Sequence, residues 1–249
     1  MRKRILFSFI GLTLITLFVL NASASWVLVP NGSFESGTVG LIPNNWVMIT
    51  ANSTDPPDAP KTATFIHEMK QTDQKYFEGV RSLWLHSRVV DEGLRIGRGS
   101  CTTAETADWI NAPEATRVRI YIRDIKSTHS DLWWGWGNSI LLFVNNVSVS
   151  KTYWEGGYYD WIFIHDEFVN WNHYNYTATG ADGQSWYVYD YSIPESVDKT
   201  HMKIEIVCWA WDWTFYSTSY FSDLEFVVDK VELLLAPPPP LSVSINPLS

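Results

Sequence analysis

Basic residues are scarce in this 249-residue sequence. Lysine and arginine together number 18, against 27 aspartate and glutamate residues, which gives a formal net charge of −9. Nucleic acids and anionic lipid surfaces both require a positively charged protein surface. The charge balance therefore argues against either of them as a partner.

Cysteine is also rare, with Cys101 and Cys208 as the only two. No Cys/His spacing resembles a zinc site. In an exported protein a single cysteine pair favours a bridge, so we predict a Cys101–Cys208 disulfide. Two separate buried thiols are the alternative, and the inward-facing position that we assign to Cys208 below is compatible with both.

Compact catalytic signatures are missing as well, including G-x-S-x-G and H-E-x-x-H. Asp160, Asp166 and Glu167 lie in an aromatic part of the chain, and two carboxylates at a suitable distance are what a glycosidase needs. With 27 acidic residues, such a pair near aromatic residues is expected by chance. We therefore expect no enzymatic activity and assign no catalytic residue.

After residue 20 no run is long and apolar enough to span a membrane. The first four residues read MRKR, residues 5–20 are apolar or small, and residues 22–24 read ASA. This pattern predicts a secretory signal peptide over residues 1–24 and a secreted or cell-surface protein, with an uncleaved membrane anchor as the alternative. Its removal leaves 15 basic and 27 acidic residues, a net charge of −12.

Helical periodicity is absent over any long stretch, and alternation with a period of two takes its place. The clearest examples lie at 117–123, 140–144, 186–191 and 203–213. These segments are rich in β-branched and aromatic residues and are bounded by turn formers. Many short strands without helices predict an all-β fold, specifically a jelly-roll β-sandwich, as a single domain over residues 25–235.

Tryptophan is the abundant residue, and ten of the fourteen lie between Trp133 and Trp213. In the segment 203–213, Ile204, Ile206, Cys208 and Ala210 alternate with a second set that ends in Trp209, Trp211 and Trp213. On a strand these three indoles follow one another at about 6.5–7 Å on one face. Such a row is either a platform for a sugar or is covered by the protein's own loops.

Two long aromatic-rich connections, 124–139 and 150–183, are expected either to wall a cleft over this row or to cover it. An acidic surface with many aromatic residues suits neutral glycans better than acidic ones. Trp84 is a further candidate for the platform, with a buried position in the other layer as the alternative. The candidate polar groups for fixing sugar hydroxyls are Arg119, Arg123, His86, Glu205 and Asp212.

Three segments resemble a known family. Residues 31–37 read NGSFESG and are followed by IPNNW at 42–46, residues 77–85 read FEGVRSLWL, and residues 226–233 read FVVDKVEL. Together they resemble the carbohydrate-binding modules found beside cellulases and xylanases, which are jelly-roll sandwiches. The resemblance covers residues 25–98 and 221–235, with Phe34 and Trp46 as expected core anchors, and the middle of the chain does not align.

The resemblance also implies a structural calcium ion, because modules of this kind often hold one between the first and last strands. Matched by motif, its ligands are Glu35 and Asp229, with backbone carbonyls near Gly79. Carboxylate and carbonyl oxygens are the ligands that calcium prefers. The alternative is that the two carboxylates bind nearby backbone or basic groups.

The tail, residues 236–249, differs in character. Residues 237–240 are a stiff proline run, and 241–247 read LSVSINP. This resembles the linker and opening strand that precede immunoglobulin-like repeats in large archaeal and bacterial surface proteins. It indicates a junction to further surface-protein domains, or a strand that is donated to a partner.

These observations predict an exported, non-catalytic domain that binds a polysaccharide through its tryptophans. A structural or adhesive cell-surface domain without glycan affinity is the alternative, and a glycan-cleaving enzyme on the same fold is a third reading. The step from jelly roll to sugar binding rests partly on analogy, because a fold does not determine a function.

Overall fold

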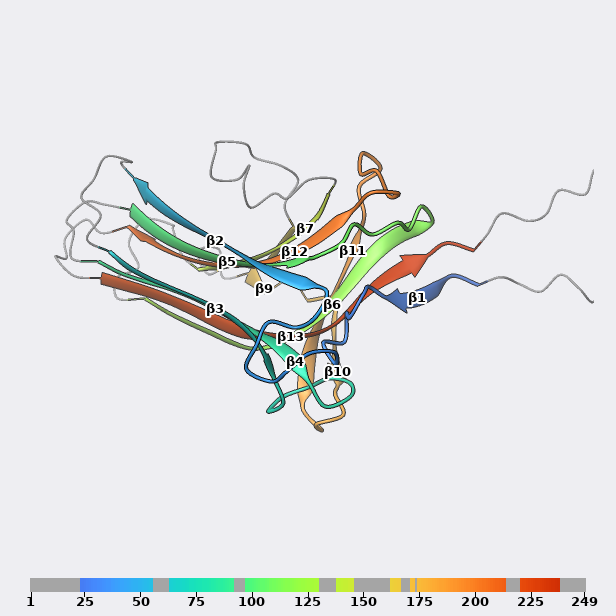
Figure 1. Cartoon of the computed structure of the whole chain (residues 1–249), viewed down its shortest axis with the longest axis horizontal. Coiled ribbons are helices and arrows are strands. Elements are labelled where there is room, and N and C mark those ends of the chain that lie inside the picture. The colour runs from blue at the N-terminus through green and yellow to red at the C-terminus, as the bar shows by residue number, and fades with distance from the viewer. Residues whose placement is uncertain are drawn as a thin grey trace, which may run out of the picture.

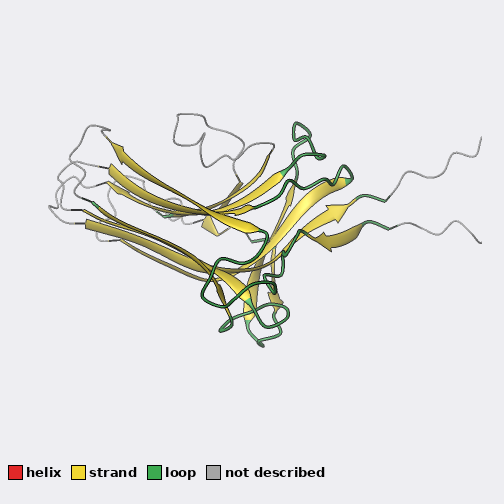
Figure 2. Ribbon diagram, viewed as in Figure 1, coloured by secondary structure: helices red, strands yellow, loops and turns green. Residues whose placement is uncertain are grey.

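The computed structural model describes residues 23–55, 63–91, 97–129, 138–145, 162–166, 171–172, 174–213 and 220–237. Across these residues every named element is a β-strand (Figure 2). None of the described segments forms a helix with the length and apolar composition that a membrane crossing requires. The predicted signal segment and most of the tail lie outside the described residues.

Two antiparallel sheets, stacked in layers, make up the described part of the chain (Figure 1). The seven-stranded sheet contains β1 (Ser25–Leu28), β3 (Thr64–Thr72), β4 (Ser82–Asp91), β6 (Ala115–His129), β10 (Tyr176–Thr179), β11 (Ser185–Ser192) and β13 (Tyr220–Leu235). The six-stranded sheet contains β2 (Trp46–Asp55), β5 (Gly97–Thr106), β7 (Ser139–Asn145), β8 (Ile162–Asp166), β9 (Trp171–Asn172) and β12 (Lys203–Trp213). The predicted all-β jelly-roll sandwich is confirmed.

The order of strands places β13 at the centre of the seven-stranded sheet and β12 within the six-stranded one. The first sheet runs β10–β11–β6–β13–β4–β3, with β1 paired to the end of β13, and the second runs β2–β5–β12–β7–β8–β9. Strands far apart in sequence are therefore neighbours, as β4 is of β13. This is why sequence reasoning alone does not bring the residues of a site together.

The core lies between the two sheets and follows the alternation of the sequence. In β12, Ile204, Ile206 and Cys208 are fully buried in it, and Leu83 and Leu85 of β4 face them from the other sheet. Burying each large aliphatic side chain contributes about 1.5–3 kcal/mol, so the period of two dictates which face of each strand turns inward.

Phe34 and Trp46 anchor the connection between β1 and β2, as predicted. Phe34 is fully buried, Trp46 is 3% exposed, and their ring centroids lie 5.2 Å apart. The turn before Phe34 is held by Asn31, whose side-chain amide donates to Ser36 O and whose Oδ1 accepts from Ser36 N, both at 2.9 Å. Asn31 has a φ of 50°, a region that asparagine tolerates better than most residues.

Part of the interior is polar and ties the two sheets together. His67 of β3 lies 2.7 Å from Asn52 Oδ1 of β2 through Nε2, and 3.3 Å from Thr102 Oγ1 of β5 through Nδ1. Ser87 of β4 donates to Thr102 Oγ1 at 2.8 Å and to Cys208 O at 2.7 Å. The His67–Asn52 contact lies at the exposed margin, whereas Ser87 and Thr102 are fully buried. Because buried polar groups are costly unless they are paired, the Ser87 and Thr102 bonds restrict how the two layers align.

The two long connections expected at 124–139 and 150–183 are shorter than predicted. β6 continues to His129, and β8, β9 and β10 interrupt the second segment. β8, β9 and β10 were missed because they have only 5, 2 and 4 residues, too few for a period of two to stand out. The remaining parts, 130–137, 146–161, 167–170 and 173, lie outside the described residues, as do Asp160 and Glu167.

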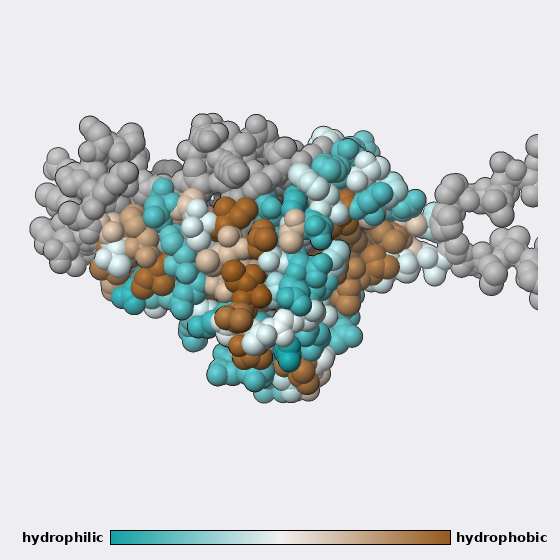
Figure 3. Space-filling model, viewed as in Figure 1, coloured by the Kyte–Doolittle hydropathy of each residue, from teal (hydrophilic) through white to brown (hydrophobic). Residues whose placement is uncertain are grey.

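The surface of the described residues mixes apolar and hydrophilic side chains. On the face seen in Figure 3, apolar residues form small groups between hydrophilic ones. The most exposed large apolar residues are Leu41 at 62% and Val80 at 57%, both in connections between strands. Isolated exposed apolar residues of this kind are ordinary in soluble domains.

Candidate functional site

The candidate site lies on the outer face of the seven-stranded sheet, where β3, β4, β13 and β6 meet. Leu83 and Leu85 of β4 turn into the core, so Trp84 between them points outward. Glu225 and Val227 of β13 lie beside Trp84 through the β4–β13 pairing, and Lys126 of β6 pairs with Glu225. Three distant segments thus supply one surface.

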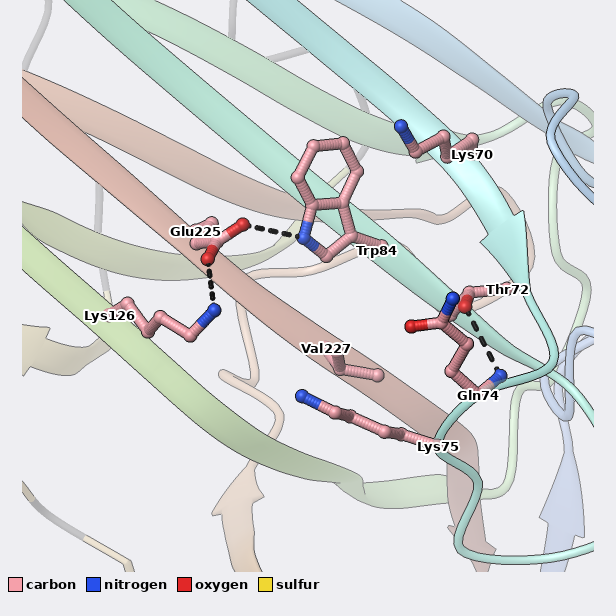
Figure 4. Close-up of a pocket in the computed structure, with 8 residues that line it drawn as sticks. All are labelled: Lys70, Thr72, Gln74, Lys75, Trp84, Lys126, Glu225 and Val227. Carbon is pink, nitrogen blue, oxygen red and sulfur yellow. Dashed lines mark hydrogen bonds and ion pairs between the residues drawn. The ribbon is translucent and has the colours of Figure 1, made fainter.

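A groove of about 290 Å³ opens on this surface (Figure 4). It is lined by Lys70, Thr72, Gln74, Lys75, Trp84, Lys126, Glu225 and Val227. The lining combines one flat aromatic side chain with hydroxyl, amide, ammonium and carboxylate groups. A flat apolar surface beside a few polar groups is the general make-up of a small-molecule or sugar subsite.

Trp84 is half-buried and fixed at both ends. Its indole Nε1 donates to Glu225 Oε2 at 3.0 Å, and the Lys70 ammonium lies 4.1 Å from the centroid of its ring system. Lys126 donates to the other oxygen of Glu225 at 2.5 Å. Burial is the largest single influence on the pKa of Glu225 and raises it, but the hydrogen bond and charge of Lys126, the bond from Trp84 and the charge of His86 together keep this pKa below its ordinary value.

Next to Trp84 lies His86, which was one of the predicted polar candidates. His86 Nδ1 lies 2.9 Å from Glu68 Oε2, and Nε2 lies 2.8 Å from Asp223 Oδ1. The hydrogen bond from His86 is the main reason that the pKa of Glu68 is lowered. Both ring nitrogens are occupied by carboxylates, so His86 helps to order this face and does not line the groove.

Arg119 and Arg123 of β6 were also predicted to fix sugar hydroxyls, but they lie outside the groove. Arg119 bonds Asp190 at 3.0 Å and its guanidinium lies 3.5 Å from the Trp26 ring centroid. Arg123 bonds Asp182 at 2.6 Å. Ion pairs and aromatic contacts engage both side chains, and neither lines the groove.

Trp209 and Trp211 lie on the outer face of the six-stranded sheet, on the opposite side of the sandwich from Trp84. Each is only 8% exposed, and both pack in a cluster with Cys101, Leu141 and Phe143. Their ring systems are 5.7 Å apart and inclined at 55°. The predicted open, flat row of indoles is therefore wrong for these two residues, and Trp84 does not extend it.

The other residues predicted around that row do not form a site either. Glu205 is fully buried within β12. Asp212 and Trp213 close β12 with their backbones, and their side chains lie outside the described part. Among the predicted sugar-contacting tryptophans, only Trp84 is placed on an accessible groove by the described residues.

Glu35 and Asp229, the predicted calcium ligands, hold one turn from two sides. Glu35 Oε1 accepts bonds from the backbone N–H groups of Val80 and Arg81, both at 2.9 Å. Asp229 Oδ2 accepts from Phe77 N at 2.6 Å and Glu78 N at 3.0 Å. Gly79, between the two pairs, has a φ of 71°, which glycine adopts without strain.

Asp229 is fully buried, and its Oδ1 accepts a further bond from Lys230 N at 2.6 Å. A register shift of β13 between Asp229 and Glu232 accompanies this geometry. Burial outweighs the three backbone bonds and raises the pKa of Asp229 to about 7. Within the described residues, no group of three or more His, Cys, Asp or Glu side chains is placed to hold a metal ion.

The predicted disulfide is wrong, because both cysteines are free and buried. In the β12–β5 pairing, Cys101 stands opposite Trp209, whereas Cys208 stands opposite Thr102. Cys208 faces the core between the sheets and Cys101 belongs to the outer cluster with Trp209. Side chains on opposite faces of one sheet cannot reach each other across the backbone.

The groove residues other than Trp84 were missed by sequence reasoning. The alternation of β3 carries a weak signal, since Met69 and Gln71 are buried while Lys70 between them is not. That signal shows that Lys70 points to the outer face of the sheet, but it does not show which side chains from other strands lie beside it. Glu225 is 141 residues from Trp84 in sequence, and only the strand order brings them together.

No protein-family model and no curated protein matches the sequence. Several solved structures have similar folds. A family 11 carbohydrate-binding module from Clostridium thermocellum, in complex with a β-1,3-1,4-mixed-linked tetrasaccharide, is 11% identical with a TM-score of 0.39, over 86% of this chain and 98% of that one. The cleaved adhesin domain of Lys-gingipain from Porphyromonas gingivalis is 12% identical with a TM-score of 0.38, over 84% and 97%.

A tandem pair of family 22 carbohydrate-binding modules from Paenibacillus barcinonensis is 11% identical with a TM-score of 0.27, over 88% of this chain and 48% of that one. The solved structures to which this chain is similar thus include carbohydrate-binding modules and an adhesin domain. At these identities and TM-scores, the likeness concerns the fold and not the ligand.

Proposed function

We propose that this chain is an exported, non-catalytic carbohydrate-binding domain and that the Trp84 groove is its sugar subsite. The observation that carries the proposal is a half-buried indole in the wall of an open groove of about 290 Å³. A pyranose presents an apolar C–H face that packs on an indole, and its hydroxyls need donors and acceptors close by.

The polar groups for those hydroxyls are already in the groove. Thr72 and Gln74 line the end near the β3–β4 turn, and Glu225 and Lys126 line the other side (Figure 4). The Glu225 bond to the indole fixes the orientation of Trp84 before a ligand arrives. Such preorganisation lowers the entropic cost of binding.

Affinity electrophoresis through gels that contain soluble polysaccharides tests the proposal. We expect at least one polysaccharide to retard the wild type, and Trp84→Ala to lose most of that retardation. Trp109→Ala is the matched control, because Trp109 is 43% exposed and stacked on His201 at 3.8 Å, outside the groove. A Trp84→Phe variant and a thermal melt of each protein separate lost binding from lost folding.

Two outcomes count against the groove. If Trp109→Ala abolishes retardation and Trp84→Ala does not, the sugar binds elsewhere. If no polysaccharide retards the wild type, the domain does not bind glycans. We propose that the domain does not cleave the polysaccharide that it binds. Reducing-end assays on that polysaccharide test this, and newly formed reducing ends would show that the domain is an enzyme.

We also propose a calcium ion at Glu35 and Asp229. The support is the oxygen-only donor set at the join of the first connection and the last strand, since calcium prefers such ligands. The competing arrangement is the set of backbone N–H bonds that already satisfies both carboxylates. A melting temperature that falls on chelation in the wild type, but not in Glu35→Gln, supports the ion, and equal melting in both conditions removes it.

A structural or adhesive surface domain is the second candidate. The burial of Trp209 and Trp211 favours it, because these aromatic side chains act as packing. It requires that assembly depend on the tail, residues 236–249. Deletion of the tail with an unchanged oligomeric state in sedimentation would count against it.

A further inference from the structure

The charge of the groove differs from that of the molecule. Three of the eight lining residues are lysines, Lys70, Lys75 and Lys126, and only Glu225 is acidic. The chain as a whole carries a formal net charge of −9. A cationic groove on an acidic protein is a local exception, and local charge in a groove selects the sign of what enters it.

Glu225 offsets the charge of only one of the three lysines. Its Oε1 lies 2.5 Å from Lys126 Nζ, and its Oε2 accepts the bond from the Trp84 indole. This carboxylate therefore neutralises Lys126 and orients Trp84. Lys75 is paired in the same way with Asp124, at 2.5 Å, so the charge that remains on the groove is that of Lys70.

The other carboxylates that contact these lysines do not line the groove. Lys70 lies 3.7 Å from Glu68, with both side chains more than 40% exposed, and an exposed pair at that distance is worth little. Lys75 lies 2.5 Å from Asp124, whose residue sits on β6 with a φ of 52°. Neither Glu68 nor Asp124 belongs to the lining, but the close pair with Asp124 neutralises Lys75, whereas the long and exposed pair with Glu68 leaves Lys70 most of its charge.

The position of Lys70 couples charge to stacking. Its ammonium lies over the Trp84 ring at 4.1 Å, on the aromatic surface that a sugar would use. A neutral sugar that stacks there must displace the ammonium from the ring, and offers it only a hydroxyl oxygen in exchange for the cation–π contact. A sugar with an anionic substituent offers the displaced ammonium a new partner.

From this arrangement we propose that the groove selects an anionic sugar residue, one that carries a carboxylate or a sulfate. The ring stacks on Trp84, and the anionic substituent binds the ammonium group of Lys70. This inference rests on the proposed function and narrows its ligand class. It replaces the neutral glycan that overall charge and composition suggested, because local charge and not net charge acts at the site.

The test is affinity electrophoresis of the wild type in polygalacturonate, in dextran sulfate, and in the neutral polymers dextran, xylan and β-glucan. We expect retardation by an acidic polymer that weakens as salt is raised. The variant Lys70→Gln should weaken it by about tenfold or more, the scale of a lost charge-assisted contact. Lys199→Gln, in the turn before β12, removes one charge outside the groove and should leave retardation unchanged.

The outcomes separate the two proposals. Retardation by polygalacturonate alone identifies the anion as a carboxylate, and retardation by dextran sulfate alone identifies it as a sulfate. Retardation by neutral polymers only overturns the anionic inference and leaves the sugar-binding function standing. If both acidic polymers retard the wild type and Trp84→Ala equally, the retardation is non-specific charge attraction. That outcome also overturns the inference.

Discussion

The indole N–H of Trp84 and the carboxylate of Glu225 meet at 3.0 Å across the boundary between β4 and β13. Lys126 holds the second oxygen of the same carboxylate from β6. One acidic side chain thus links three adjacent strands on the outer face of the sheet. It fixes the aromatic wall of the groove and cancels one of its three ammonium charges.

Replacement of Glu225 separates these two roles. Glu225→Gln keeps an oxygen for the indole and removes the charge, so we expect tighter binding of an acidic polysaccharide, by several-fold, and a loss of stability below about 1 kcal/mol. Glu225→Ala removes both, and should cost about 1–3 kcal/mol. Gel retardation and urea titrations measure the two effects, and weaker acidic binding by Glu225→Gln would contradict the charge argument.

Trp211 should behave as a core residue and not as a ligand contact. It is 8% exposed and packs in the outer cluster of the six-stranded sheet. Truncation to alanine leaves a large cavity, so we expect Trp211→Ala to lower the free energy of unfolding by about 3–5 kcal/mol. The exposed Trp109→Ala serves as the comparison in the same urea titration, and a similar small loss in both would show that Trp211 is not packed.

The two cysteines should remain reduced and unreactive in the native protein. Burial raises the pKa of the Cys101 thiol to about 12 and raises the pKa of the Cys208 thiol well above its ordinary value. Since the thiolate is the reactive form, we expect no rapid labelling in the native state and two labelled thiols after unfolding without reductant. A midpoint of unfolding that shifts on addition of reductant would instead reveal a bridge.

His67 should make stability depend on pH. Burial lowers its pKa below 6.5, and this outweighs a backbone bond that acts in the opposite direction. The folded state therefore disfavours the protonated ring, and the contribution of His67 is present above about pH 6.5 and lost as pH falls through the lower folded value. The raised pKa of Asp229 acts in the opposite direction over the same range, so urea titrations at pH 7.5 and 5.5 should show the loss as a difference between the wild type and a variant without His67.

The control for that experiment is His67→Gln, which cannot gain the proton. Its neutral amide still reaches toward Asn52 and Thr102, the partners that His67 contacts across the two sheets. We expect the difference between the two pH values to be smaller in this variant than in the wild type. An identical difference would assign the pH dependence to other groups.

Local patterns in the sequence were sufficient for the fold class and for the faces of individual strands. The alternation of Ile204, Ile206 and Cys208 with larger residues placed them in the core, because a strand turns successive side chains to opposite faces. Phe34 and Trp46 were predicted as core residues from a different local signal, their place beside a turn motif. In β5 the run of Ser, Cys and Thr around Cys101 has no apolar alternation, so its face was not readable.

The site itself was decided by tertiary structure. Strand order placed Trp84 and Trp211 on opposite sides of the sandwich, paired Glu225 with Trp84, and set Cys101 and Cys208 on opposite faces of one sheet. Where a strand alternates clearly, as β12 does, the sequence determined which way its side chains turn, since that follows from the period of a single strand. Which strands become neighbours depends on contacts between segments more than 100 residues apart, and only the folded chain fixes them.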